Sequence, residues 1–171
     1  IKSKKGNLVA LIIDHNLRVE SYFESQKTKD YLSILNIKSK IIRISDKKLN
    51  KRNMNEARNN RFDKLISYCI KNNILHLFLG HHSGDNIETF LMRKIAGSNI
   101  EGLGAMKFSS IRKNIQIIRP LLNYTKKQII KFNKSNKIKF IADPSNIDEK
   151  YARIKIRNFL TKTNKIKSII N

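Results

Sequence analysis

The feature that most constrains the fold of this chain is the alternation of short apolar runs with longer amphipathic stretches. Four runs have the length and content of buried strands, at residues 8–13, 40–44, 75–79 and 115–118. Other stretches place apolar side chains at near-helical spacing, at residues 20–35, 53–71, 87–95 and 125–135. Strands that alternate with helices predict an α/β fold, a parallel sheet with helices on both faces.

Local signals indicate where some of these elements end. Thr125 is expected to cap the helix that follows it, and residues 97–104 form a glycine-punctuated loop. Residues 143–146 read as a turn, followed by a basic helix from about 149 to 160. We expect one domain at residues 1–160, with 161–171 as a tail or the start of a linker.

Charge and cysteine content narrow the class of protein. Lys and Arg number 36 against 13 Asp and Glu, a formal charge of +23, which predicts a large anionic partner such as nucleic acid. AT-rich coding DNA explains the abundance of Lys equally well. The single cysteine, Cys69, is expected in the core and excludes an internal disulfide. No run is long enough to span a membrane and no signal peptide is visible, so we expect a cytoplasmic protein.

The polar segment after the third apolar run carries the most chemistry. Ligands of parallel α/β sheets bind at the carboxyl ends of the strands. Asp85 and Glu88 are three residues apart and share a face if helical, so they suit Mg²⁺ beside a phosphate, or a cationic amine. His81 and His82 suit phosphate contact or proton transfer. The same carboxylate spacing also fits a helix capping box, which is a purely structural role.

Three further clusters have a functional and a structural reading. Residues 14–18 follow the first strand, where a ligand would bind, but a polar cluster there is commonly only a loop. Arg58 and Arg61 share a helical face that suits a phosphate or carboxylate clamp, or a solvated basic surface. Arg153 and Arg157 are four residues apart and repel each other unless an anion bridges them.

Together and in this order, these segments resemble the N-terminal catalytic domain of the tRNA(Ile)-lysidine synthetases, which are N-type ATP pyrophosphatases. The resemblance extends from about residue 8 to residue 160 and implies an adenine-nucleotide alpha hydrolase-like, Rossmann-like fold. The family's HHxDDQxET motif is similar to residues 81–89, and its IRPLL and DPSN segments match residues 118–122 and 143–146. Its GSGxxGL, DHxLR and EARxxRF/Y types resemble residues 97–103, 14–18 and 56–62.

The chain also departs from the family pattern. Gly84 stands where the family has the first of two aspartates, Asn86 where it has Gln, and Ala96 and Asn99 where it has a basic residue and Gly. The family begins with a strand and an SGGxDS loop that binds the ATP phosphates, and no such loop is present in this sequence. We therefore expect the first strand, the phosphate loop and the C-terminal tRNA-binding domains to be missing, and the isolated chain to be inactive.

The resemblance implies that ATP adenylates C2 of the wobble cytidine of a tRNA(Ile) with a CAU anticodon, and that free L-lysine displaces AMP. ATP and Mg²⁺ are the implied cofactors. Catalytic roles fall on His81, His82, Asp85 and Glu88, with Asp85 also the candidate metal ligand. Contacts to substrate, phosphate or tRNA fall on Asp14, His15, Arg18, Arg58, Arg61, Arg119, Asp143, Ser145, Asn146, Arg153 and Arg157.

Two alternatives remain at this point. A related tRNA-thiolating ATP pyrophosphatase is disfavoured, because such relatives use paired cysteines and this chain has only Cys69. A non-catalytic basic RNA-binding remnant is favoured by the missing loop and by Gly84. It is opposed by the motifs that the chain retains.

Overall fold

The computed structural model describes residues 8–14, 16, 19–44, 54–99, 104–140 and 156, with residue 19 and residues 54–58 described by their backbone alone. Contacts between residues divide the chain into two compact units, residues 1–75 and 76–171. We describe each unit by itself.

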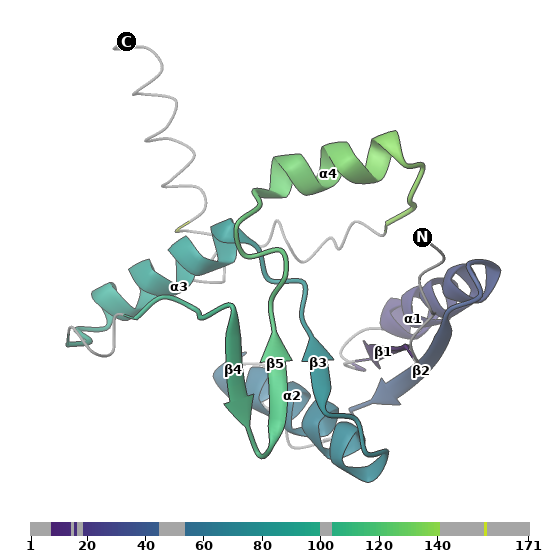
Figure 1. The fold of residues 1–171 in the computed structure, drawn as a ribbon, viewed down its shortest axis with the longest axis horizontal. Helices are drawn as coiled ribbons and strands as arrows, with labels where there is room; N and C mark the ends of the chain where they lie inside the picture. The colour runs from purple at the N-terminus through teal and green to yellow at the C-terminus, as the bar shows by residue number, and fades with distance from the viewer. Residues whose placement is uncertain are drawn as a thin grey trace. The chain divides into compact units, whose positions relative to one another are not determined.

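The first unit contains a parallel strand–helix–strand motif. It consists of β1 (Val9–Asp14), α1 (Val19–Ile34) and β2 (Lys38–Arg43), followed by α2 (Met54–Lys71). β1 and β2 pair in parallel from Val9 opposite Lys38 to Asp14 opposite Arg43 (Figure 1). α1 is the crossover that parallel pairing requires, and it contacts both strands.

The buried side chains of α2 confirm its predicted helical pattern. Phe62, Leu65, Ile66 and Cys69 are buried at the i, i+3, i+4 and i+7 spacing of one helix face. Cys69 is 1% exposed, as expected of a core residue, and burial raises the pKa of its thiol. The thiol therefore stays neutral and serves packing.

The second unit is built around a mixed three-stranded sheet. Its elements are β3 (His76–Phe78), α3 (Ser83–Ile95), β4 (Ser109–Arg112), β5 (Ile115–Ile118) and α4 (Lys126–Ser135). β5 lies in the middle, parallel to β3 and antiparallel to β4, as the arrows in Figure 1 show. Leu77, Ile115 and Ile117 supply its buried side chains.

The antiparallel strand β4 corrects the expectation of a wholly parallel sheet. Lys113 and Asn114 join β4 to β5 with φ of 48° and 63°, which is the left-handed pair of a type I′ hairpin turn. A two-residue connection can only produce an antiparallel pair. β4 was not predicted from the sequence, because its Ser-Ser-Ile-Arg run has a single apolar residue. The Lys-Asn turn that follows it is also a weaker hairpin signal than Asn-Gly.

Helices α1 to α4 end in the same way. The chain enters the left-handed region two residues after each of these helices, at Asn36, Asn73, Gly97 and Lys137. The next amide then bonds to a carbonyl five residues back, as in Ile74 to Cys69 at 2.8 Å. This is the hydrogen bond of a Schellman-type ending, made here with Asn or Lys at three of the four positions.

The other predicted elements are confirmed within a few residues, and Thr125 caps α4 as expected. α3 differs most, because it starts at Ser83 and not at residue 87. The turn at 143–146 and most of the final helix lie outside the described residues, although Ile156 is helical and 8% exposed. No helix in the described part of the chain is long and apolar enough to cross a membrane. The single domain at 1–160 stays a prediction.

Candidate functional site

The start of α3 is organised by a histidine. The amide of Leu79 donates to the carbonyl of Ile118 at 2.9 Å, and the chain then turns from β3 into the helix. His82 takes the N-cap position with extended backbone. Its Nδ1 accepts from the amide of Gly84 at 3.1 Å, and its own amide donates to Oδ2 of Asp85 at 2.9 Å. These reciprocal bonds form a capping box.

The capping box lies three residues earlier than the sequence indicated. The predicted structural reading paired Asp85 with Glu88, whereas the box joins His82 to Asp85. Because Nδ1 of His82 accepts a hydrogen bond, the proton of a neutral ring sits on Nε2, which lies 3.6 Å from Oδ2 of Asp85. The amide of His82 thus orients the carboxylate of Asp85 by a hydrogen bond, and the imidazole lies beyond hydrogen-bond distance of it.

The two carboxylates of α3 lie at different depths. The side chain of Asp85 is 17% exposed, whereas Glu88 is 3% exposed one turn further along the helix. We call His81, His82, Asp85 and Glu88 the histidine–carboxylate cluster. Asp85 is partly exposed and accepts a hydrogen bond from the amide of His82, whereas Glu88 is buried. Such a pair can accept hydrogen bonds from a cationic amine.

Gly84 makes room for the histidine cap. A Cβ at this position would lie 2.9 Å from Cε1 and 3.1 Å from Nδ1 of His82, which is too close without a shift of the ring. An aspartate at this position, as the resemblance would have it, requires the imidazole to move. The capping position of the His82 ring therefore depends on glycine at position 84.

Arg119 lies at the same edge of the sheet, directly after β5. Its Nη1 donates to the carbonyl of Lys107 at 2.9 Å and to Oγ of Ser110 at 3.1 Å, while its amide donates to the carbonyl of Phe108 at 2.8 Å. Its Nε is buried without a hydrogen-bond partner among the described residues. Burial lowers the pKa of its guanidinium, which remains charged at neutral pH. The edge thus carries a fixed positive charge.

α3 also holds the segment that leads into β4. Oδ1 of Asn86 accepts from the amide of Met106 at 2.7 Å, and the guanidinium of Arg93 donates to the carbonyl of Gly104. The sequence showed Asn86 only as a departure from Gln, and neither its contact nor that of Arg93 was predicted. Neither contact has a local sequence signal, since each spans more than ten residues.

A second polar cluster lies in the first unit, at the end of β1. Asp14 is 1% exposed, and its Oδ1 accepts from the amide of Asn16 and from Oγ of Ser21, both at 2.9 Å. Its Oδ2 accepts from Nε of Arg43 at 3.1 Å. The Arg43 guanidinium also lies 5.0 Å from the centroid of the Tyr22 ring. We call Asp14, Ser21 and Arg43 the Asp14 cluster.

The Asp14 cluster stabilises a buried negative charge. Burial acts against ionisation of this carboxyl, but the bonds from Asn16, Ser21 and Arg43 outweigh it, so its pKa lies below the usual value. Through Ser21 and Arg43, the carboxylate links β1 to α1 and β2. Sequence reasoning missed Arg43 and Ser21, although Asp14 and Arg43 are the last pair of the parallel register. A substrate role for Asp14 stays a prediction.

The structure does not place every residue of the predicted site. Arg61 is half-buried in α2, and Arg58 lies in the same helix with its side chain outside the described part. The other predicted contacts lie outside the described residues: His15, Arg18, Asp143, Ser145, Asn146, Arg153 and Arg157. The described residues contain no group of three or more His, Cys, Asp or Glu that could hold a metal ion. Mg²⁺ at Asp85 would therefore need ligands from phosphate or water.

The sequence that forms this α/β fold matches a known family. The family of PP-loop domains matches residues 1–164, and the chain belongs to it. The family confirms the α/β fold class that the motif order implied.

The chain is similar to named members in particular. It is 38% identical over 160 residues to the tRNA(Ile)-lysidine synthase of Wolbachia pipientis wMel, covering 93% of this chain and 37% of that protein. The synthase of Orientia tsutsugamushi is 38% identical over 160 residues, covering 91% and 35%, and that of Rickettsia typhi is 37% identical over 166 residues, covering 95% and 38%. The chain thus spans just over a third of the length of these curated relatives.

A solved structure shares the fold. The U34-tRNA thiolase NcsA from Methanococcus maripaludis superimposes with a TM-score of 0.74 at 17% identity, covering 93% of this chain and 57% of that chain. At this identity the likeness concerns the fold alone.

Proposed function

We propose that this chain is the catalytic domain of a tRNA(Ile)-lysidine synthase. In the proposed reaction, ATP adenylates C2 of the wobble cytidine of tRNA(Ile), and the amine of free lysine then displaces AMP. The observation that carries the proposal is the similarity to lysidine synthases, which extends over 93% of the chain in the Wolbachia pipientis comparison. Because the proposed reactants are ATP, free lysine and tRNA, we expect the protein to act in the cytoplasm.

The histidine–carboxylate cluster suits the second step. Lysine reaches the site as an ammonium ion but must attack as a neutral amine, so the site has to bind the cation and accept a proton. Asp85 is oriented by the amide of His82 at 2.9 Å, and a carboxylate accepts up to about four hydrogen bonds, so capping leaves it acceptor capacity. Glu88, buried on the same helix face, supplies a second negative charge.

The remaining groups of this edge suit the nucleotide. Arg119 offers a charged guanidinium beside the cluster, which would meet a phosphate or the lysine carboxylate. His81 and His82 would lie near the nucleotide. Bound Mg²⁺ would neutralise phosphate charge, and Asp85 is the more exposed of the two carboxylates that could share in holding it.

Lysine transfer is the direct test. The protein expressed from its complete gene, and not the isolated 171-residue chain, would be incubated with ATP, radiolabelled lysine and a tRNA(Ile) transcript bearing a CAU anticodon, followed by nucleoside analysis. We expect label in one modified cytidine, dependent on ATP. A transcript with uridine at the wobble position is the matched control and should take no label. A protein that binds the transcript but transfers no lysine under any of these conditions would contradict the proposal.

Sulfur transfer is the competing reaction suggested by the fold of the thiolase. The two chains are 17% identical, so the likeness to the thiolase supports a shared fold and no shared reaction. Cys69 is the single cysteine of the sequence and is 1% exposed with a raised thiol pKa, so it is poorly suited to carry sulfur.

A further inference from the structure

The positive charge of this chain is unevenly distributed. Between Glu101 and Asp143 the sequence contains ten Lys or Arg residues and no Asp or Glu. In α1, by contrast, Lys27 and Lys29 are outnumbered by acidic residues, namely Glu20, Glu24 and Asp30. A general drift of codons toward lysine would not spare one exposed helix and saturate another. The basic stretch therefore calls for a local explanation.

The lysines of α4 form one ridge of the helix. Lys127, Lys131 and Lys134 are all exposed and stand at the i, i+4 and i+7 spacing of one face, whereas Ile129 and Ile130 are half-buried. Like charges so placed repel each other in a helix. An anion that spans the ridge would relieve this repulsion.

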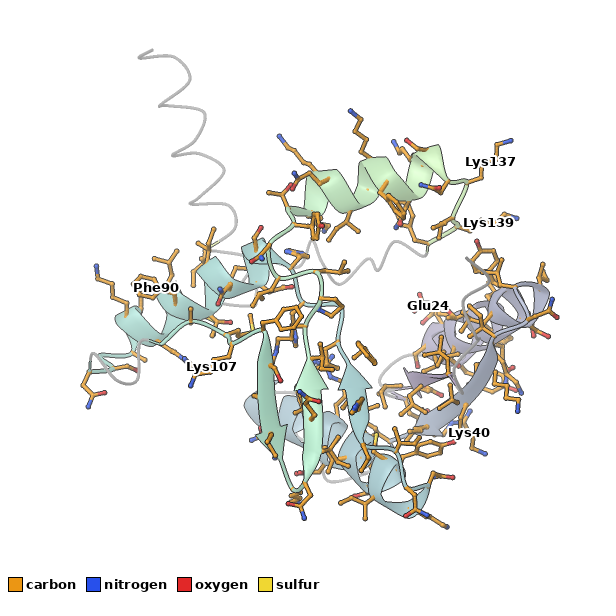
Figure 2. The ribbon with its side chains drawn as sticks, in the orientation of Figure 1. Glu24, Lys40, Phe90, Lys107, Lys137 and Lys139 are labelled. Carbon is orange, nitrogen blue, oxygen red and sulfur yellow. The ribbon has the colours of Figure 1, made fainter. Side chains whose placement is uncertain are left out.

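The ridge is continued by further groups of the same kind. Lys137 and Lys139 follow directly after the end of α4 (Figure 2). The large aromatic side chains Phe132 and Phe140, in the same stretch of sequence as these lysines, are 61% and 52% exposed. Exposed aromatic rings interleaved with lysines are typical of surfaces on which nucleic-acid bases stack.

We propose that this α4 surface, formed by Lys127, Lys131, Lys134 and Lys137, binds the phosphate backbone of RNA. The identity of that RNA as the tRNA substrate rests on the proposed function. Lysine is a flexible point charge, so the surface contributes affinity and position along the backbone without reading the bases. It is distinct in kind from the histidine–carboxylate cluster, which would handle the small reactants.

The test compares two sets of three lysines. Lys127→Gln, Lys131→Gln and Lys134→Gln are combined in the protein as it is encoded, and affinity for a tRNA(Ile) transcript is measured against salt concentration. We expect a loss of roughly 10- to 100-fold in affinity, with a log–log salt slope shallower by about two to three units. The matched control combines Lys27→Gln, Lys29→Gln and Lys40→Gln, which removes the same charge from exposed lysines of the first unit.

The control should change affinity by less than about threefold, since counterion release depends on phosphates contacted and not on net charge. Glutamine keeps helix propensity close to that of lysine, and thermal unfolding would verify that both variants fold. Equal weakening by both sets would overturn the proposal in favour of a net-charge effect. Loss of binding to phosphatidylserine vesicles with unchanged tRNA affinity would also overturn it and indicate a membrane partner.

Lysine transfer separates this proposal from the proposed function. We expect the α4 variant to raise KM for tRNA while kcat and KM for lysine stay near the wild-type values. If the wild type transfers lysine and the α4 variant binds tRNA normally, the proposed function stands and the α4 surface is wrong. If the wild type transfers no lysine yet its tRNA affinity depends on the α4 lysines, the α4 surface stands and the proposed function is wrong.

Discussion

Two carboxylates, Asp14 at the end of β1 and Asp85 in the first turn of α3, differ in their surroundings. Asp14 is 1% exposed and accepts hydrogen bonds from Asn16, Ser21 and Arg43, so its negative charge is matched inside the protein. Asp85 keeps a side chain that is 17% exposed, and its Oδ2 accepts a hydrogen bond from the amide of His82 at 2.9 Å. The first carboxylate is enclosed, and the second is held but still accessible.

The difference lies in what each strand neighbour supplies. β2 ends in Arg43 directly opposite Asp14 in the register, so the charge is neutralised where the strands meet. At the end of β5, Arg119 donates to the carbonyl of Lys107 and to Ser110 instead of to a carboxylate. The second unit therefore keeps both signs of charge available at one edge, which is what a site for an ammonium ion and a phosphate needs.

The largest expected effect is on catalysis at Asp85. Asp85→Ala should lower the rate of lysine transfer by about 1000-fold, since a positioned acid–base group contributes on that scale. Asp85→Asn separates chemistry from folding, because its amide oxygen can still accept from the amide of His82. It should keep the melting temperature and lose the activity. If the Asn variant were as active as wild type, Asp85 would only be a cap.

Asp14 should behave in the opposite way, as a determinant of stability. Asp14→Ala should lower the free energy of unfolding by about 3 kcal/mol, because buried donors lose their acceptor and a paired charge is broken. Chemical denaturation would measure it, with Asp30→Ala, an exposed acid of α1, as the control. A loss below about 1 kcal/mol, within reach of an ordinary surface change, would contradict the enclosed role.

The contribution of Asp14 should also depend on pH. Its pKa is lowered in the folded state, so its stabilisation is fully present above the unfolded value of about 3.9 and is lost as pH falls through the folded value. Urea titrations from pH 7 to pH 2.5 should show this acid limb. Asp14→Asn should flatten it, whereas Asp30→Asn should leave it in place.

The smallest expected effect concerns the cap at Gly84. Gly84→Ala should destabilise the protein by about 1 kcal/mol, since the new methyl group displaces the His82 ring from the helix start. In a His82→Ala background the same change should stabilise by up to about 1 kcal/mol, because alanine favours a helix over glycine. Thermal unfolding of the four proteins measures both. The same sign in the two backgrounds would show that the glycine is not needed for the cap.

Much of the fold was predictable because its signals are local. The α2 pattern from Phe62 to Cys69 and the Thr125 cap depend on residues within two turns of each other, and both were found. The strand Ser109–Arg112 was missed because only its pairing with β5 makes it a strand. For the site, the order of motifs located His81 to Glu88 and Arg119 at strand ends, and the structure brings these to one edge of the second unit.

The sequence by itself determined the elements other than β4, their order and the family, because apolar periodicity, caps and ordered motifs are encoded in consecutive residues. Only the tertiary structure decided which polar groups meet. Asp14 and Arg43 are 29 residues apart, and Asn86 and Met106 are 20 apart, so their contacts follow from strand register and chain return. The role of Gly84 was likewise decided in space, since it depends on where the ring of His82 lies. Hydrogen bonds act over about 3 Å, a scale that spacing along the chain does not specify.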